Sequence, residues 1–479
     1  MRTIWAVLLV AVTALGCGTT TAPAPAPPPE TAPTPTPQPD PGLPARLVAD
    51  VTGAGALVHL IELQRIAEAN GGNRALGTPG YDASVEYVAG VLRDAGYDVQ
   101  TPGFTIRRFS AQEQRLTVDG GPVDVTALVY SPATPQGGVT GPLTVMTGQG
   151  CVPTDAAAVT PGSVALVRRG TCTFAQKVAG AVAAGAAAVI VINTDDVPLA
   201  DGSLGEQTTG AVPTGGVSRS AGDALAGRAG ASVTLTLATT VEETQSRNVL
   251  AQTRTGDPGE VVVAGGHLDS VPEGPGINDN GSGTAALLET AVRLGGAPPV
   301  TNAVRFAFWG AEEVGLVGSS RYVQGLSEEE RARIALYLNL DMVASPNTSY
   351  MVYDGDDSDR EGAGAGPPGS AAVERALIEG LAGAGVTASS TDFTGRSDYG
   401  PFIAAGIPSG GLFTGAGEPK TSEQAMLHGG TAGQPYDACY HQACDRVEAI
   451  DHTALDRNSD AVAAAVARFA LSTEELANG

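Results

Sequence analysis

Short apolar segments with the pattern of β-strands alternate with longer segments with the pattern of α-helices from residue 246 to the end of the chain. In the helix-like segments, apolar residues recur every three to four positions. Such alternation predicts the α/β fold class, with a mostly parallel, mixed central sheet and helices on both faces. The expected strands are 261–265, 303–309 and 335–340, and the expected helices are 283–294, 371–384 and 456–469.

The residues that precede position 111 extend the same fold. Residues 57–69 and 81–95 have helical periodicity and are followed by glycine, and a strand is expected over 99–106. From about 110 to 240, short Val-, Leu- and Thr-rich runs are separated by Gly and Pro, which predicts a β-rich unit. The expected domains are a discontinuous one at 46–110 and 241–475 and a smaller one, 111–240, inserted into it.

The N-terminus has the composition of an export signal. Residues 1–17 combine an early arginine, a short apolar stretch and small residues before Cys17, and the stretch is too short to span a membrane. Residues 14–17 resemble a bacterial lipobox, although leucine usually stands where this chain has Ala14. Lipidation of Cys17 and simple secretion both remain open, and either gives an extracellular or cell-surface location. Residues 18–45, mostly Thr, Ala and Pro, predict a disordered linker.

Four further cysteines form an even set, which suits disulfide bonds in an oxidising compartment. Three pairings are possible. The local pairs Cys151–Cys172 and Cys439–Cys444 close the shortest loops and are therefore expected.

Residues of the types that bind zinc follow several of the expected strands. The carboxyl ends of strands in an open α/β sheet form the usual ligand site, and carboxylates and imidazoles are zinc ligands. The glycine-rich loop 274–283 lacks the lysine of a P-loop, so a phosphate site is disfavoured. These observations predict a zinc hydrolase that opens amide bonds. The candidate residues of this zinc site are His267 and Asp269 after the first strand, Glu312 and Glu313 after the second, Asp341 after the third, Asp279 in the glycine-rich loop, and His441 between Cys439 and Cys444.

The charges of this set suit two metal ions. Asp279, Glu313, Asp341 and a bridging hydroxide supply four negative charges, which two divalent cations neutralise. One shared carboxylate, with one histidine and one further carboxylate for each ion, leaves each ion an open position. Two ions held in this way share the attacking oxygen and polarise a carbonyl. Cobalt and manganese accept the same ligands as zinc.

Together the motifs resemble the exported dinuclear zinc aminopeptidases of bacteria, in metallopeptidase family M28. The resemblance covers about 50–110 and 245–475. It is carried by Gly71-Gly-Asn-Arg74, Gly77-Thr-Pro-Gly-Tyr81, His267-Leu-Asp269, Asn278-Asp-Asn-Gly-Ser-Gly283, the run from Gly310 to Ser319, Asn339-Leu-Asp-Met342, Gly395-Arg-Ser-Asp398 and the run from Cys439 to Cys444.

The resemblance implies the ligands of each ion. His267 and Asp341 would bind one zinc, Glu313 and His441 would bind the other, and Asp279 would bridge the two. It also implies a cis peptide bond after Asp279.

The resemblance further implies catalytic and supporting roles. Glu312 would act as general base and then as general acid, and Tyr440 would donate a hydrogen bond to the oxyanion. Asp269 would orient His267. Arg396 would lie near the terminal groups of the substrate, although a structural ion pair with its neighbour Asp398 is an equal alternative.

A calcium site is a further expectation. Some exported relatives bind calcium through a pair of aspartates on one helical face and an N-terminal aspartate. Here Asp456 and Asp460 have that spacing, and Asp50 is the matching N-terminal residue. A helix cap explains Asp456 equally well.

The inserted segment resembles the protease-associated (PA) domain. Cys172-Thr-Phe174, the alanine-rich helix after it and the strand 188–192 are the most specific part of this resemblance. In exported peptidases this domain is proposed to contact substrates or partners.

We therefore expect an exported zinc aminopeptidase that acts as a monomer and removes apolar, leucine-like residues from the N-termini of peptides. The alternatives are a carboxypeptidase, a one-zinc glutaminyl cyclase, and a binding protein that has lost catalysis. The net charge of −24 argues against nucleic acid as a partner. The only membrane contact expected is a lipid anchor at Cys17.

Overall fold

The computed structural model describes residues 38–478 apart from 200–201, 206–209, 361 and 363. The predicted export signal and lipidation site lie outside the described residues, as does most of the predicted linker. That linker extends to residue 45, but helix α1 (Leu43–Asp50) already begins at Leu43, so the predicted end is wrong. Pro44 suits the first turn of a helix, where its missing N–H needs no acceptor. Leu43 and Leu47 are buried and anchor α1 to the core.

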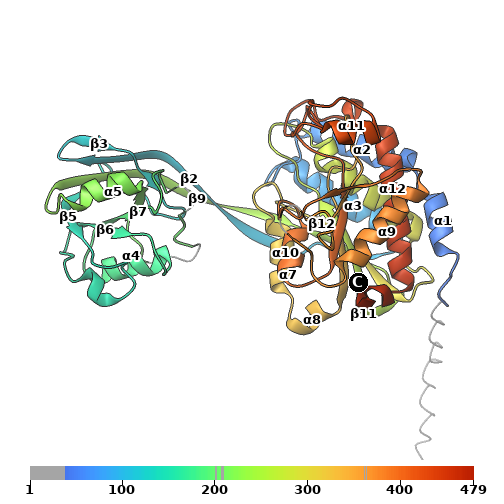
Figure 1. Ribbon diagram of the computed structural model, residues 1–479, viewed down its shortest axis with the longest axis horizontal. Helices are drawn as coiled ribbons and strands as arrows, with labels where there is room; N and C mark the ends of the chain where they lie inside the picture. The colour runs from blue at the N-terminus through green and yellow to red at the C-terminus, as the bar shows by residue number, and fades with distance from the viewer. Residues whose placement is uncertain (1–37, 200–201, 206–209, 361, 363, 479) are drawn as a thin grey trace, which may run out of the picture. The chain divides into compact units, whose positions relative to one another are not determined.

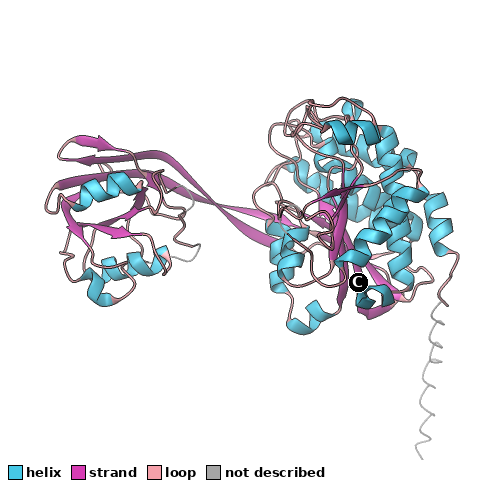
Figure 2. Cartoon of the chain, viewed as in Figure 1, coloured by secondary structure: helices cyan, strands magenta, loops and turns pink. Residues whose placement is uncertain are grey.

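The described elements follow the expected alternation (Figures 1 and 2). The remaining α-helices are α2 (Gly53–Ala69), α3 (Pro79–Asp94), α4 (Phe174–Ala183), α5 (Arg219–Ala226), α6 (Gly283–Leu294), α7 (Val317–Gly325), α8 (Glu328–Ala332), α9 (Ser370–Gly383), α10 (Tyr399–Ala404), α11 (Ser422–His428) and α12 (His452–Leu471). The strands are β1 (Asp98–Gln100), β2 (Gly103–Val118), β3 (Gly121–Val123), β4 (Thr126–Ala127), β5 (Val139–Val145), β6 (Val164–Arg168), β7 (Ala188–Ile192), β8 (Thr214–Val217), β9 (Ser232–Arg247), β10 (Val249–Gln252), β11 (Asp257–His267), β12 (Asn302–Trp309), β13 (Ile334–Leu340), β14 (Met351–Tyr353), β15 (Ser389–Thr391) and β16 (Ser409–Phe413). Short helical turns are η1 (Pro153–Ala156), η2 (Ile277–Ser282), η3 (Val447–Ala449) and η4 (Glu474–Asn478).

The larger domain is built on an eight-stranded sheet in the order β1-β10-β12-β11-β13-β16-β14-β15. The four central strands, β12, β11, β13 and β16, are parallel. β10 runs antiparallel to β12, and β14 runs antiparallel to β16. The predicted mixed, mostly parallel sheet is therefore confirmed, and the carboxyl ends of β12, β11 and β13 meet at one edge.

Side chains of the central strands alternate between two hydrophobic cores. On β12, Val304, Phe306 and Phe308 pack with apolar residues of α2, α3, α6, α9 and α12. Ala307 and Trp309 point to the other face and pack with residues of α7 and α10. Helices cover both faces of this sheet for that reason (Figure 2).

The inserted segment forms a second sheet with its own hydrophobic cores. Strands β5, β6, β7 and β8 of this sheet are parallel neighbours, and α4 and α5 accompany them. β2 and β9 pair along almost their whole length, and their residues Ser110 and Thr240 face each other. The predicted boundaries, 110/111 and 240/241, thus cut strands that continue on both sides.

The strand predicted over 99–106 is two strands. β1 pairs with β10, whereas β2 begins at Gly103 and pairs with β9. Pro102 lies between them and has no N–H to donate to a sheet. Its carbonyl oxygen instead accepts a hydrogen bond from the backbone nitrogen of Asn248 at 3.1 Å.

Two local predictions are confirmed. The disulfides are Cys151–Cys172 and Cys439–Cys444. The peptide bond between Asp279 and Asn280 is cis.

Within the described residues, no single helix has the length and hydropathy that a membrane span requires. Helices α1 and α2 reach these values only together, with a bend of 52° between them.

Candidate metal centre

The sheet edge brings the five predicted metal ligands together. His267 is the last residue of β11, Asp341 directly follows β13, and Glu313 lies in the turn after β12. β11 lies between β12 and β13, so these three side chains are neighbours. Asp279 lies in η2, the turn that leads into α6, and His441 lies in the loop closed by the second disulfide.

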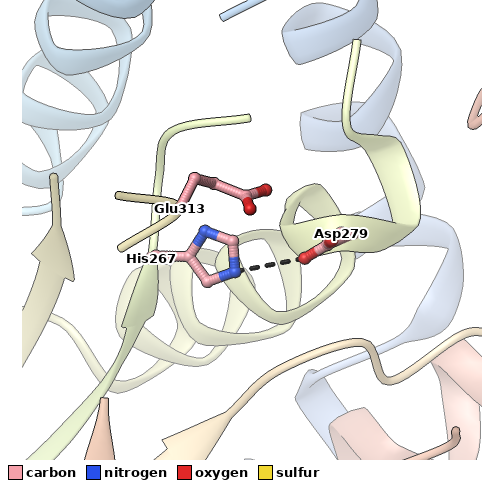
Figure 3. A group of neighbouring side chains, drawn as sticks. All are labelled: His267, Asp279 and Glu313. Carbon is pink, nitrogen blue, oxygen red and sulfur yellow. Dashed lines mark ion pairs between the residues drawn. The ribbon is translucent and has the colours of Figure 1, made fainter. Parts of the chain in front are cut away.

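Asp279 directs its two carboxylate oxygens to different histidines. Its Oδ1 is 3.2 Å from Nε2 of His267 (Figure 3). Its Oδ2 is 3.1 Å from Nε2 of His441. Nε2 of His267 is also 3.4 Å from Oδ1 of Asp341, and Nε2 of His441 is 3.1 Å from Oε2 of Glu313. Ligand atoms at the zinc–ligand distance are about 3.3 Å apart in a tetrahedral site. The two sets of donor atoms therefore have the spacing of two adjoining zinc sites.

Unpartnered oxygens also point to a cation here. Oε1 of Glu313 and Oδ1 of Asp341 are buried and have no hydrogen-bond partner. Nδ1 of His267 contacts the backbone oxygen of Asp269 at 3.0 Å, which leaves Nε2 as the ligand nitrogen. Buried carboxylate oxygens are costly unless a proton donor or a metal satisfies them. The residues present thus fit a zinc centre.

The protein concentrates negative charge at this point. Burial raises the pKa of Glu312 well above its ordinary value and raises that of Glu313 to about 7. Burial also acts to raise the pKa of Asp279, but hydrogen bonds from His267 and His441 outweigh it and lower that pKa to about 2. Hydrogen bonds to Asp279 and Glu313 raise the pKa of His441 to about 10. Bound divalent cations would relieve this crowding of carboxylates.

Asp269 contacts His267 differently from the simplest expectation. Its backbone oxygen accepts the imidazole contact, while its carboxylate lies 3.8 Å from Nδ1. The carboxylate instead accepts hydrogen bonds from the backbone nitrogens of Glu312 at 3.1 Å and Glu313 at 3.4 Å. Asp269 therefore holds the turn that carries both glutamates as well as the histidine.

The centre opens into a cavity of about 450 Å³. Glu312, Tyr440 and Arg396 line this cavity beside the ligands. The ring of Tyr440 stacks on that of His441, with centroids 3.9 Å apart, and burial raises the pKa of its hydroxyl, so it remains a proton donor. Among the described residues, both carboxylate oxygens of Asp398 are buried without a hydrogen-bond partner, so Arg396 does not donate to them. A role of Arg396 toward the substrate stays a prediction.

Two aspartates that sequence reasoning missed support the shared carboxylate. Asp445 accepts hydrogen bonds from the backbone nitrogens of Asn278 at 2.6 Å and Asp279 at 3.0 Å. Asp437 accepts a hydrogen bond from the side-chain amide of Asn278 at 2.6 Å. Both aspartates are 2% exposed, which shows that they are internal supports. Their positions just outside the disulfide loop were the only signal in the sequence.

A buried arginine fixes the loop between β11 and η2. Arg74 is fully buried and donates hydrogen bonds to the carbonyl oxygens of Leu268, Pro275 at 3.0 Å and Gly276 at 2.7 Å. The motif that ends at Arg74 therefore stabilises the loop between the proposed ligands His267 and Asp279.

The predicted calcium ligands are arranged less completely. Oδ1 of Asp456 accepts a hydrogen bond from the backbone nitrogen of Gly53 at 2.6 Å, which caps α2. Burial and the nearby Asp456 raise the pKa of Asp460 to about 6. Among the described residues, the clusters of close metal-type donor atoms do not include Asp50, Asp456 and Asp460 as a set. Calcium binding remains a prediction.

Comparison with known proteins follows the two domains. Residues 248–466 match the sequence model of peptidase family M28, and residues 139–225 match that of the PA domain. A probable lipoprotein aminopeptidase of Mycobacterium tuberculosis is 52% identical over 421 residues, which are 86% of this chain and 84% of the relative. The chain belongs to peptidase family M28.

Two further comparisons bear on activity. A probable leucine aminopeptidase 2 of Aspergillus fumigatus is 44% identical over 84% of this chain and 80% of its own. The structure of a zinc aminopeptidase from Bacillus subtilis superimposes with a TM-score of 0.53 and 29% identity, over 88% of this chain and 96% of the other. This M28 protein is accordingly a metallo-aminopeptidase with a PA domain, and zinc is its supported metal.

Proposed function

We propose that this enzyme removes single apolar residues from the N-termini of peptides with two zinc ions. His267 and Asp341 would hold one ion, Glu313 and His441 the other, and Asp279 both. The observation that carries this proposal is the pair of contacts from Asp279, whose two oxygens face different histidines at 3.2 and 3.1 Å.

The catalytic groups come from two loops at the cavity. When bound, zinc supplies Lewis acidity that polarises the scissile carbonyl and acidifies water. Glu312 takes the proton of the attacking water and passes it to the leaving amine, a role that suits a carboxyl group whose pKa burial raises. Tyr440 donates its proton to the oxygen that becomes negative in the transition state.

The cavity supports a preference for a free N-terminus and an apolar side chain. Glu312 and its acidic neighbours would hold the positive α-amine of the substrate. Met342, Tyr353 and Phe413 add apolar surface to the same cavity. The name of the Aspergillus relative, a leucine aminopeptidase, agrees with such a side chain.

The test combines zinc content with two substrates. We expect about two zinc ions per chain, chelator-sensitive hydrolysis of Leu-p-nitroanilide, and no hydrolysis of its N-acetylated form. One zinc per chain would favour the glutaminyl cyclase, cleavage of the blocked substrate would favour another peptidase class, and a metal-free inactive protein would favour a binding role.

A variant tests the general base. Glu312→Gln removes the proton acceptor but keeps the size of the side chain, so turnover should fall by at least about 100-fold while zinc content stays unchanged. The control is Glu328→Gln, which changes an exposed glutamate of α8 and should leave kcat unaltered. Wild-type turnover in Glu312→Gln would reject the assignment.

We further propose that the enzyme is exported. If Cys17 is lipidated, the lipid anchors the enzyme to a membrane. The Mycobacterium relative is named a lipoprotein, which agrees with this proposal. Cys17→Ser should release the enzyme from membranes if the anchor forms.

A further inference from the structure

A chain of four buried hydrogen bonds ends on one of the proposed zinc ligands. Nε1 of Trp309 donates to the hydroxyl of Tyr337 at 2.9 Å, and that hydroxyl donates to Oδ1 of Asn339 at 3.1 Å. Nδ2 of Asn339 donates to Oγ of Ser397 at 2.9 Å, and this hydroxyl donates to Oδ2 of Asp341 at 2.6 Å. The other four residues of this hydrogen-bond chain are each at most 4% exposed, so water does not compete for these contacts.

The chemistry of the two ends fixes the direction of every donor in this chain. The indole of Trp309 can only donate, and a carboxylate that binds zinc, as Asp341 is proposed to do, can only accept. The Tyr337 hydroxyl must therefore accept from the indole and give its own proton to Asn339. Burial raises the pKa of Tyr337 well above its ordinary value, so that proton stays in place.

The amide of Asn339 then has one satisfactory orientation. If its oxygen and nitrogen were exchanged, two donors would face the oxygen of Tyr337, and Ser397 would turn its proton toward Asn339. Oδ2 of Asp341 would lose its donor in a buried site, which is costly. The direction of each hydrogen bond thus determines that of the next, and hydrogen bonds within a buried chain of this kind strengthen one another.

We propose that Trp309, Tyr337, Asn339 and Ser397 are positioning residues that determine which oxygen of Asp341 binds zinc. Ser397 occupies Oδ2, so the ligand is Oδ1, which is buried, unpartnered and 3.4 Å from Nε2 of His267. This inference rests on the proposed function, because it assumes that Asp341 is a zinc ligand.

The hydrogen-bond chain should affect the binding of only one of the two zinc ions. Asp341 faces His267 and not His441, and the carboxylate on the other side, Glu313, has no such support: its Oε2 contacts His441 and its Oε1 has no partner. Loss of the hydroxyl of Ser397 should therefore weaken the ion held by His267 and Asp341. Groups that orient metal ligands typically contribute 10–100-fold to metal affinity, and we expect a loss of about that size.

The test measures both zinc affinities of the full-length protein by competition with a chromophoric chelator. Ser397→Ala should weaken one of the two binding steps by about 10–100-fold and leave the other within about threefold, and Ser397→Thr should restore it. Tyr337→Phe should weaken the same binding step by less, because Ser397 can still donate to Asp341. The ring at position 337 can still stack on Phe402, with 3.9 Å between the centroids. Tyr97→Phe is the matched control: it removes a buried hydroxyl that donates to Ala291, and both zinc affinities should stay unchanged.

The outcomes separate the inference from the function on which it rests. Unchanged affinities in Ser397→Ala, or equal weakening of both steps with a less stable metal-free protein, would overturn the positioning role. Failure of the wild-type protein to bind a second zinc ion would reject the two-zinc function. If Ser397→Ala then weakened the binding of the single zinc ion, the positioning role of the hydrogen-bond chain would still be supported. With zinc saturating, Ser397→Ala should regain most of its kcat at an unchanged KM, a recovery that a general structural defect would not give.

Discussion

Two neighbouring glutamates reach different surroundings from one turn. Glu313 points an oxygen at His441, 3.1 Å away, and so joins the proposed metal ligands. Glu312 lines the substrate cavity and contacts none of the histidines within ion-pair distance. Asp269 holds the backbone nitrogens of both residues, so the two carboxylates keep separate directions. This division permits one of them to bind metal while the other moves protons.

Tyr440 is the residue whose single hydroxyl should matter most to the transition state. Tyr440→Phe keeps the ring on His441 and removes the proton donor, so kcat should fall by about 100-fold while KM changes little. Steady-state kinetics on Leu-p-nitroanilide measure both quantities. Tyr436→Phe provides a control, because its hydroxyl donates to Gln424 and the residue lies outside the cavity lining. An unaltered kcat in Tyr440→Phe would show that the ring serves only for packing.

At the residue scale, the sequence predicted the convergence of the donors but not their supports. His267, Glu313 and Asp341 could be predicted because each follows an apolar strand and has metal-ligand chemistry. The supporting roles of Asp445 and Ser397 could not, because the sequence does not show which distant residues these side chains contact. Their roles depend on segments distant in the chain meeting in the fold.

The loop that carries His441 is the least regular element of the centre. His441 has a positive φ of 58° and is 40% exposed, and the disulfide from Cys439 to Cys444 closes the loop around it. Cys439→Ser should loosen this loop and weaken one zinc by about tenfold, as loss of ligand orientation does elsewhere. Chelator competition measures the change. Cys151→Ser opens the other disulfide, in the insert, and should leave both zinc affinities unaltered; equal effects of the two variants would contradict the prediction.

A buried carboxylate, that of Glu289, joins α6 to α2. Glu289 contacts Nε of Arg293 at 2.8 Å and Nε2 of His59 at 3.7 Å. Gly55 of α2 lies so close that a Cβ there would be 2.0 Å from Oε1 of Glu289. This pairing explains why His59 is an internal structural residue.

The same group gives a pH dependence. Burial acts to raise the pKa of Glu289, but hydrogen bonds from His59 and Arg293 outweigh it and lower that pKa below its ordinary value. A lowered pKa in the folded state stabilises the protein above the unfolded value of about 4.5, and this contribution disappears as the pH falls through the folded value. Glu289→Gln should therefore reduce the free energy of unfolding by about 1–3 kcal/mol at pH 7 and by much less near pH 3.

Urea denaturation at the two pH values, with matched metal-free samples, measures this difference. Glu62→Gln is the control, because the pair of Glu62 with Arg65 is partly exposed on the same α2 and contributes little. A destabilisation by Glu289→Gln that does not depend on pH would refute the assignment.

At the element scale, strong periodicity made the helices and central strands predictable. The residues predicted for α6 agree with its observed bounds, 283–294, and β12 and β13 begin one residue earlier than predicted. Other bounds were less accurate: β11 covers 257–267 where 261–265 was predicted, and α12 begins at 452 where 456 was predicted. Two further errors occurred at prolines, since Pro102 separates two strands and Pro44 lies in the first turn of a helix. A proline marks a boundary, but the neighbouring structure decides which boundary it marks.

In the part of the chain that the structure describes, a smaller domain is inserted into a larger one. The paired strands β2 and β9 run from one domain into the other. Because Ser110 and Thr240 face each other on β2 and β9, a two-residue Asn-Gly turn can join them in place of residues 111–239. The shortened protein should fold, bind zinc and hydrolyse Leu-p-nitroanilide at a rate near that of the intact enzyme. Zinc content and kinetics check this outcome, and an insoluble or zinc-free product would show that the insert is required for the larger domain to fold.

The order of the ligands along the chain has a consequence for how the enzyme matures. Four of the five proposed ligands lie between His267 and Asp341, but the fifth, His441, comes a hundred residues later, and Asp445 fastens its loop to Asp279. A polypeptide that is cut short before Cys439 would retain four of the proposed ligands and lack His441. Binding of the full proposed complement of metal would then be a property of completed chains alone.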